Sequence, residues 1–192
     1  MKKWFLTFVL VSFVLVSLVP GAVSDGEMSW MPKKGDYITV DLENSQGYIF
    51  REDQSDYFSF PVVTGQKRNV YYIGKYYYAA TPAKEWYIRS KNIQSDRITY
   101  AQSGEFLRLY HQGERTHYGF HGHRDAEVMM TDDLGRFRSM GCVIVRDDIL
   151  DLLEEEYLVN DQNLKVVTTR TEVDLPKRRL ASTIWPFWVV GN

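Results

Sequence analysis

The residue types best suited to covalent chemistry are gathered in one stretch of the chain. All four histidines, His111, His117, His121 and His123, lie in a short interval, and the single cysteine, Cys142, follows soon afterwards. A thiolate is a strong nucleophile, and a nearby imidazole can take the proton from the thiol and return it to a leaving group. This combination is compatible with nucleophilic attack of the sulfur on a carbonyl group; a buried inert cysteine and an intermolecular bridge are the alternatives. Because the chain has one cysteine, an intrachain disulfide is excluded.

The residues around the thiol predict an activated position. Cys142 ends the sequence Ser139-Met-Gly-Cys142, and a helix is predicted to begin a few residues later. Backbone N–H groups are unpaired at a helix start, so we expect this position to lower the thiol pKa. The N–H groups of Gly141 and Cys142 would also stabilise the oxyanion formed when the sulfur attacks a carbonyl group, and glycine at 141 leaves room for that carbonyl.

The composition of the 192-residue chain is that of a folded domain. It is 44% hydrophobic, 15% aromatic and 25% charged, which argues against a disordered or fibrous protein. The formal net charge of −2 and a pI near 6.1 argue against a nucleic-acid-binding protein, whose affinity would come from neutralising phosphates. The sequence has no internal repeat and no sign of a second domain, and we expect a monomer.

The N-terminal segment is typical of a secretory signal. Lys2 and Lys3 precede a charge-free run over residues 4–24, which ends with a Pro20-Gly21 break and small residues that fit cleavage before Asp25. Residues 1–24 are therefore predicted to be a signal peptide, and the protein is predicted to reach the periplasm or cell envelope. The alternative is an uncleaved anchor, because the charge-free run is just long enough to cross a hydrocarbon layer of about 30 Å. Membrane association is then expected through this segment.

The rest of the chain divides into a lead-in, one domain and a tail. Residues 25–36 are polar and are predicted to have no fold of their own, residues 37–170 form the domain, and residues 171–192 form the tail. The tail contains the apolar stretch Trp185–Val190, which is too short to cross a membrane. We expect this stretch to pack against the domain; the alternative is contact with a membrane surface or a partner.

The residue periodicity predicts a mainly β domain with one principal helix, an α+β fold. Apolar residues alternate with polar ones in 37–42, as on a half-buried strand, and the first three strands are expected to form a meander. Aromatic and β-branched segments predict further strands, whose tyrosines are expected to form cross-strand pairs; stacking on sugars or bases is the alternative. Helical spacing of apolar residues predicts a helix over Asp147–Tyr157. The predicted strands cover residues 37–42, 48–51, 57–63, 70–78, 86–88, 97–100, 106–110 and 164–168.

Several short motifs follow one another in a specific order. They are Ile38-Thr-Val-Asp-Leu42, Phe60-Pro-Val-Val-Thr-Gly65, Thr81-Pro82 with Trp86-Tyr-Ile88, Phe120-His-Gly122 and Ser139-Met-Gly-Cys142. This order resembles the catalytic domain of L,D-transpeptidases (YkuD-type), in which I-x-V-D-L is followed by P-V-S-T-G-like, T-P-x-G-x-[FYW]-x-I, H-G and S-x-G-C segments. The resemblance covers residues 38 to about 168. Each piece is weak alone, whereas their joint occurrence in order is specific.

The resemblance implies a β-sandwich-like fold and an enzyme of peptidoglycan and cell-wall biogenesis, with a role in cell shape. Cys142 would attack the carbonyl of the third residue, a diamino acid, in a donor tetrapeptide stem and release the terminal D-alanine. His121 would be the base, steadied by the backbone carbonyl of Gly122, and Ser139 would shape the pocket. An amine acceptor would then take the acyl group, giving a 3-3 cross-link or wall attachment. The expected partner is a peptidoglycan stem peptide, and no cofactor is expected.

The chain departs from the family pattern at a few positions. Met140 stands where many members have a second histidine, and Ile144 stands where Arg or Asn is usual two residues after the cysteine. Arg146 is expected to reach back and supply the missing polar contact. Ala83-Lys84 replaces the usual x-Gly of the T-P-x-G segment, which affects only the local turn. His123 is expected to lie on the same strand face as His121 and to support it.

Three other interpretations remain open from the sequence. The same thiol site could hydrolyse the thioester, as an L,D-carboxypeptidase or endopeptidase. A non-catalytic peptidoglycan-binding module is suggested by Met140 and Ile144. A zinc hydrolase would use His117, His121, His123 and Cys142 as ligands, but the chain has no H-E-x-x-H element and four protein ligands would leave no position for water. We therefore expect no metal, and we expect His111 and His117 to be surface residues.

Overall fold

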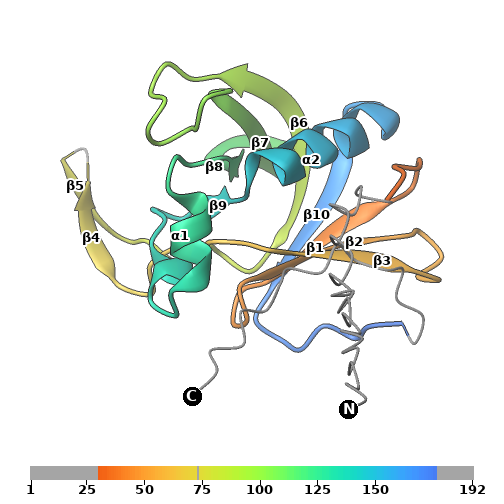
Figure 1. Ribbon diagram of the computed structural model, residues 1–192, viewed down its shortest axis with the longest axis horizontal. Helices are drawn as coiled ribbons and strands as arrows, with labels where there is room; N and C mark the ends of the chain where they lie inside the picture. Colours follow the sequence, from red (N-terminus) through yellow and green to blue (C-terminus); the bar gives the residue numbers. More distant parts are fainter. Residues whose placement is uncertain (1–29, 73, 177–192) are drawn as a thin grey trace, which may run out of the picture.

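The computed structural model describes residues 30–72 and 74–176, and in these ranges the strands form an eight-stranded sheet and a separate hairpin (Figure 1). The sheet order is β3-β2-β1-β10-β6-β7-β8-β9, while β4 and β5 pair with each other. The predicted signal peptide 1–24 and the apolar stretch Trp185–Val190 lie outside the described residues. The elements are β1 Tyr37–Asp41, β2 Gln46–Phe50, β3 Tyr57–Pro61, β4 Asn69–Tyr72, β5 Lys75–Tyr78, β6 Glu85–Ile93, β7 Glu105–His111, β8 Glu114–His121, α1 Ala126–Thr131, a 3-10 turn Gly135–Phe137, β9 Val143–Ile144, α2 Asp147–Val159 and β10 Leu164–Thr169.

The sheet is built around β1 and β10, which join its two halves. β1 pairs antiparallel with β2, and β2 with β3, which is the predicted meander. β10 lies parallel to β1, with Val166 opposite Ile38, and antiparallel to β6, with Leu164 opposite Ile88. These four side chains are fully buried, because alternate residues of each strand face the same side of the sheet.

Helix α2 packs against the sheet and completes the hydrophobic core (Figure 1). Its buried apolar residues belong to one cluster with side chains from both halves of the sheet. Burying a side chain of this size stabilises the fold by about 1.5–3 kcal/mol relative to leaving it in water. The predicted mainly β fold with one principal helix is confirmed, and the structure adds the short helix α1. The buried apolar residues of α2 are Ile149, Leu150, Leu152, Leu153 and Tyr157.

A buried polar cluster ties the end of the predicted lead-in to α2. Trp30 is 5% exposed, and its Nε1–H donates to Glu156 Oε1 at 2.7 Å. The Arg51 guanidinium lies 3.7 Å from the centre of the Trp30 ring and pairs with Asp36. Burial raises the pKa of Glu156 to about 8 and also raises the pKa of Asp36. The lead-in therefore joins the folded domain from Trp30 onward, rather than lacking a fold of its own up to residue 36.

Two predicted strands have other structures. Residues 97–100 form turns, because the Asp96 carboxylate accepts hydrogen bonds from the N–H groups of Ile98 and Thr99 and so holds the backbone in a tight bend. Residues 70–78 are the paired strands β4 and β5 rather than one strand, and Gly74 lies in the turn between them. Strand β8 was not predicted, since its polar and glycine-containing sequence lacks a regular apolar alternation.

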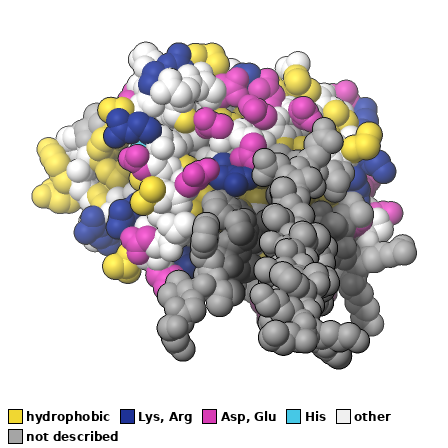
Figure 2. Space-filling view, viewed as in Figure 1, with side chains coloured by type: hydrophobic (Ala, Val, Ile, Leu, Met, Phe, Trp, Pro, Cys, Tyr) yellow, Lys and Arg dark blue, Asp and Glu magenta, His cyan; other side chains and the backbone are white. Residues whose placement is uncertain are grey.

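The β4–β5 hairpin stands apart from the main sheet at one end of the molecule (Figure 1). Its tyrosines do form a cross-strand pair, Tyr71 with Tyr76, whose ring centres are 4.8 Å apart. Tyr71, Tyr72, Tyr76 and Tyr78 are exposed, and Figure 2 shows hydrophobic side chains at this end of the molecule. In the described ranges, no helix has the length and apolar character needed to cross a membrane.

Replacing Glu156 by glutamine should remove a pH dependence of stability. The folded chain keeps the Glu156 proton to a pH of about 8, whereas the unfolded chain loses it near 4.5, so stability should fall as pH rises through that window, by an amount on the order of a few kcal/mol. Thermal unfolding followed from pH 5 to pH 9 should show this decline in the native protein and a flatter profile in Glu156→Gln. The control is Glu155→Gln, an exposed position on the same helix; equal pH profiles for all three proteins would contradict the assignment.

Candidate active site

The turn that carries the cysteine, residues 139–142 (the cysteine turn), is held by the segment that follows β3. Val63 and Ile144 exchange two backbone hydrogen bonds, of 2.9 and 2.8 Å. The Ser139 N–H donates to the Thr64 carbonyl at 3.1 Å, and the Gln66 N–H donates to the Ser139 carbonyl at 3.0 Å. Both ends of the cysteine turn are thus paired to the extended segment containing the Phe60–Gly65 motif, which explains why these two motifs occur together.

Ser139 and Gly141 shape the turn from within. The Ser139 hydroxyl donates to the Cys142 carbonyl at 2.5 Å and accepts from the Gly141 N–H at 3.1 Å. Gly141 has a φ of +115°, and a Cβ there would lie 2.7 Å from the Tyr118 ring, so only glycine fits. The Gly141 N–H is therefore already engaged, which leaves the Cys142 N–H as the remaining predicted oxyanion donor.

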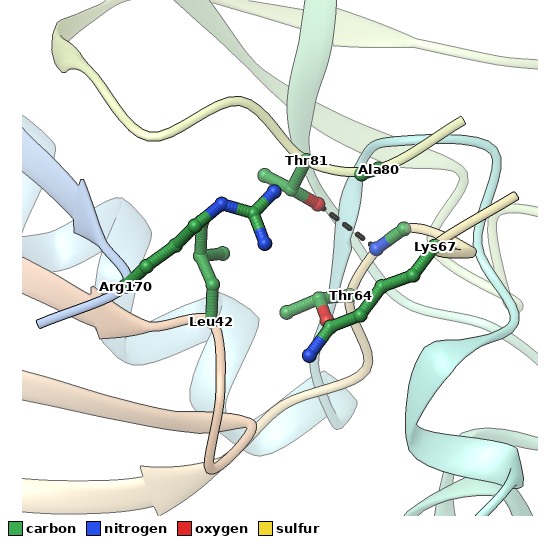
Figure 3. A pocket seen from close by; sticks show the side chains of 7 residues that line it. Leu42, Thr64, Lys67, Ala80, Thr81 and Arg170 are labelled. Carbon is green, nitrogen blue, oxygen red and sulfur yellow. Dashed lines mark hydrogen bonds between the residues drawn. The ribbon is translucent and has the colours of Figure 1, made fainter. Parts of the chain in front are cut away.

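Thr81 supports the same turn from the outside. Its hydroxyl donates to the Gly141 carbonyl at 2.9 Å. It also accepts from the Gly65 N–H at 2.9 Å, the bond marked by the dashed line in Figure 3. Thr81 also lines a shallow hollow with the basic side chains of Lys67 and Arg170. The sequence placed Thr81 in a motif, but its role as a bridge depends on partners distant along the chain.

An irregularity in β8 supplies a backbone carbonyl to the sulfur. Along β7, Arg108 lies opposite Gly119 and Tyr110 lies opposite Arg115, so residues 116–118 bulge out opposite Leu109 alone. The His117 carbonyl accepts a hydrogen bond from the Cys142 Sγ at 3.7 Å. Such bulges bend a strand and re-aim its groups, and they are common beside active sites. The contribution of His117 is therefore its backbone, while its side chain is exposed as expected.

His121 is buried and oriented by its neighbour in sequence. Its ring is 4% exposed and packs against Tyr100 and Phe106, with ring centres 4.9 and 5.9 Å apart. Its Nδ1 lies 2.6 Å from the Gly122 carbonyl, which can only accept a hydrogen bond, so the proton is assigned to Nδ1. Nε2 is then the ring nitrogen that carries the lone pair of a base, and the carbonyl contact implied by the resemblance is present.

The strand register brings the cysteine and His121 to the same face of the sheet. Strand β9 pairs parallel with β8, with Val143 opposite Phe120 and Ile144 opposite His121. Continued by one residue, this register puts Cys142 beside Gly119, two positions from His121 and on the same face. Phe120 and Val143 point to the other face and are fully buried in the core.

Desolvation determines the charge of both groups. Burial raises the pKa of the Cys142 thiol to about 11, although the Gly119 N–H and the Arg108 charge act to lower it. Burial lowers the pKa of His121 to about 4. Near pH 7 the pair is thus a neutral thiol and a neutral imidazole. The expectation of a helix-lowered thiol pKa is wrong, because α2 begins only at Asp147 and β9 separates it from the sulfur.

Other predicted residues lie differently from the expectation. Strand β8 ends at His121, so His123 is outside the strand, and its Nδ1 accepts a hydrogen bond from the Asp125 N–H at 3.0 Å. Arg146 pairs with Asp148 at the start of α2, and its expected contact near the cysteine stays a prediction. Ile144 is buried in a small apolar cluster with Val63, Ala126 and side chains of α1.

The ligands that the zinc alternative requires are not gathered. Within the ranges the structure describes, no three His, Cys, Asp or Glu side chains are placed to share a metal ion. His111 is the last residue of β7, where its Nδ1 is 2.9 Å from the Glu85 carbonyl and its ring packs against Trp86. The ligand set proposed for zinc is therefore not supported by the geometry.

Comparison with known proteins identifies the family. The family model described as the YkuD L,D-transpeptidase catalytic domain matches residues 35–174. No curated protein sequence matches the chain. The chain belongs to the L,D-transpeptidase catalytic domain family, whose members are peptidoglycan-modifying enzymes.

Solved structures share the fold at low sequence identity. Bd1075 of Bdellovibrio bacteriovorus is 14% identical with a TM-score of 0.50, over 78% of this chain and 53% of that chain. A mutant of the helical cell shape determining protein Pgp2 of Campylobacter jejuni is 14% identical with a TM-score of 0.50, over 78% and 51% of the two chains. An Enterococcus faecium L,D-transpeptidase mutant is 14% identical with a TM-score of 0.46, over 71% and 50%. The matched part of this chain thus spans about half the length of each of these proteins.

Thr81→Val should loosen the cysteine turn. The substitution keeps the shape of the side chain but leaves the buried Gly65 N–H and Gly141 carbonyl without their partner, which costs about 1–3 kcal/mol for each unsatisfied group. We expect a lower free energy of unfolding in urea. The control is Thr171→Val, at an exposed position near the end of the described chain. Equal stability of the two variants would contradict the bridging role.

The rate of Cys142 alkylation by iodoacetamide should rise with pH up to about 11. Iodoacetamide reacts with the thiolate, and a thiol pKa of about 11 means that each pH unit below that value reduces the thiolate tenfold. The same chain unfolded in urea should reach its plateau near the ordinary cysteine pKa of about 8.5. A plateau near neutral pH in the folded protein would show a preformed thiolate and contradict the neutral pair.

Proposed function

We propose that this chain is an exported cysteine acyltransferase that acts on peptidoglycan stem peptides. The observation that carries the proposal is the β8–β9 register, in which the buried, neutral imidazole of His121 and the single thiol of the chain share one face of the sheet. Membership of the L,D-transpeptidase family supports the choice of substrate. The proposed location is the periplasm or cell envelope, and the protein is proposed to act there as a monomer.

The first half-reaction forms a thioester. His121 Nε2 takes the thiol proton as the sulfur bonds to the carbonyl carbon of the third residue of a donor tetrapeptide, which is proposed to be a diamino acid. The oxyanion that develops is stabilised by the Cys142 N–H. The C–N bond to the terminal D-alanine then breaks, and the imidazolium gives its proton to the departing amine. Because burial lowers the pKa of His121 to about 4, the imidazolium is a strong acid for this second step.

The second half-reaction transfers the acyl group. An acceptor amine gives a proton to His121 and attacks the thioester carbonyl, the C–S bond breaks, and the sulfur recovers the proton. A stem-peptide amine gives a 3-3 cross-link, and an amine on a protein gives wall attachment. Water as the acceptor gives the L,D-carboxypeptidase or endopeptidase reaction from the same thioester.

The residues around the pair have supporting roles in this proposal. Ser139 and Gly141 hold the cysteine turn in place, and the Gly122 carbonyl keeps the His121 proton on Nδ1. His123 supports the site indirectly, because its Nδ1 accepts a hydrogen bond from Asp125 in the turn that follows β8. Arg146 contributes by pairing with Asp148 at the start of α2. The mechanism uses no cofactor.

Incubation of tetrapeptide-containing muropeptides with the purified domain, followed by mass analysis, tests the proposal. We expect loss of one D-alanine per donor, with cross-linked products if transfer dominates and trimmed peptides if hydrolysis dominates. Cys142→Ala should abolish both, and His121→Ala should reduce turnover by ~10²–10⁴-fold, the usual contribution of acid–base catalysis.

A control separates catalysis from binding. His111→Ala alters a histidine at the end of β7 that the proposed mechanism does not use, and it should leave turnover within about twofold. A carbapenem should add its mass to the native protein and not to Cys142→Ala. Stem-peptide binding without carbapenem adduct or D-alanine release would refute the acyltransferase and favour the binding module.

A further inference from the structure

Arg108 is a buried cation on the face of the sheet that carries the cysteine. Its side chain lies on β7 and the residue is 9% exposed. Its Nε–H donates to the Asn92 Oδ1 at 3.0 Å, one Nη1–H donates to the Thr116 carbonyl at 2.8 Å, and the guanidinium lies 4.7 Å from the centre of the Phe106 ring. Within the described ranges, these partners are all neutral and no carboxylate pairs with Arg108. A buried charge without a counter-charge is costly, so its presence calls for a reason.

The strand register aligns this cation with the sulfur. Arg108 lies directly opposite Gly119 on β8, and the parallel pairing of β8 with β9 puts Cys142 on the other side of Gly119. The three residues form one row across neighbouring strands and face the same side. Gly119 carries no side chain of its own, and the Phe106 ring lies over it, 2.5 Å from the position that a Cβ would take.

The β8 bulge holds both groups through consecutive carbonyls. The Thr116 carbonyl accepts from Arg108 and the His117 carbonyl accepts from Cys142. The groups near Arg108 that can carry negative charge are Cys142 and the phenols of Tyr100 and Tyr110, while Arg115 opposes it with a like charge. Of these groups, the sulfur is the one that gives up its proton in the proposed reaction, so its thiolate is the anion that this guanidinium is placed to meet.

We propose that Arg108 is a positioning residue that compensates the negative charge on the Cys142 sulfur when the thiol gives its proton to His121. This inference rests on the proposed function, because it assigns the charge that the acyl transfer requires. The residue two positions after the cysteine, Ile144, is buried among apolar side chains and offers no charge on this face. The cation is instead supplied by β7, in the row that Arg108 shares with Gly119 and Cys142.

The test measures thiol ionisation without any peptide substrate. Arg108→Gln removes the charge and keeps an amide N–H for the Thr116 carbonyl, whereas Arg108→Lys keeps a charge. At pH 9, we expect iodoacetamide to alkylate Cys142 of Arg108→Gln about tenfold more slowly than the native protein, and Arg108→Lys to recover most of that rate. Arg89→Met, at an exposed position on β6, is the matched control and should alkylate at the native rate. An Arg108→Gln rate within twofold of the native rate, in a variant with a native unfolding transition, would overturn the proposal.

A second measurement uses the native protein alone, in case Arg108→Gln does not fold. A cation beside the sulfur should favour anionic iodoacetate over neutral iodoacetamide, so the ratio of their rates should be several-fold higher on the folded chain than on the chain unfolded in urea. An equal or lower ratio would overturn the proposal. The muropeptide assay distinguishes the two proposals. If the native protein releases D-alanine but Arg108→Gln alkylates at the native rate, only the role of Arg108 is refuted. If Arg108→Gln alkylates more slowly but the native protein releases no D-alanine, only the acyltransferase is refuted.

Discussion

The parallel pairing of β9 with β8 is the constraint on which the site depends. β9 is a strand of two residues at the edge of an eight-stranded sheet, and its other side is paired to the segment after β3. This double pairing holds the cysteine turn between two elements that are far apart in sequence. Ser139, Gly141 and Thr81 then act on a backbone whose position is already determined.

Burial has opposite effects on the two members of the pair and makes both of them neutral. The thiol pKa is raised and the imidazole pKa is lowered by the same loss of water contact. A neutral pair can exchange a proton in either direction without first breaking an ion pair. The charge that develops during reaction must then be met by groups already in place, which is the role that backbone dipoles and a buried guanidinium can fill.

Much of the fold followed from local patterns in the chain. The alternation in residues 37–42 and the helical spacing in 147–157 identified β1 and α2, since burial of one face of an element leaves a periodic trace. The prediction of a strand over 97–100 was wrong, because the Asp96 carboxylate accepts hydrogen bonds from the Ile98 and Thr99 N–H groups that a strand would need for pairing. Strand β8 escaped prediction because its residues are held by strand pairing and a bulge rather than by apolar alternation.

The sequence by itself determined which residues could react, the order of the motifs that contain them, and through these the family. Tertiary structure alone decided the environment of those residues. Desolvation raises the thiol pKa, whereas the helix start was expected to lower it. His123 lies beyond the end of β8, and Arg108 lies on β7 in the same row as Gly119. The physical reason is that pKa values and charge compensation depend on distances and burial between segments distant in the chain, whereas residue type and periodicity are local properties.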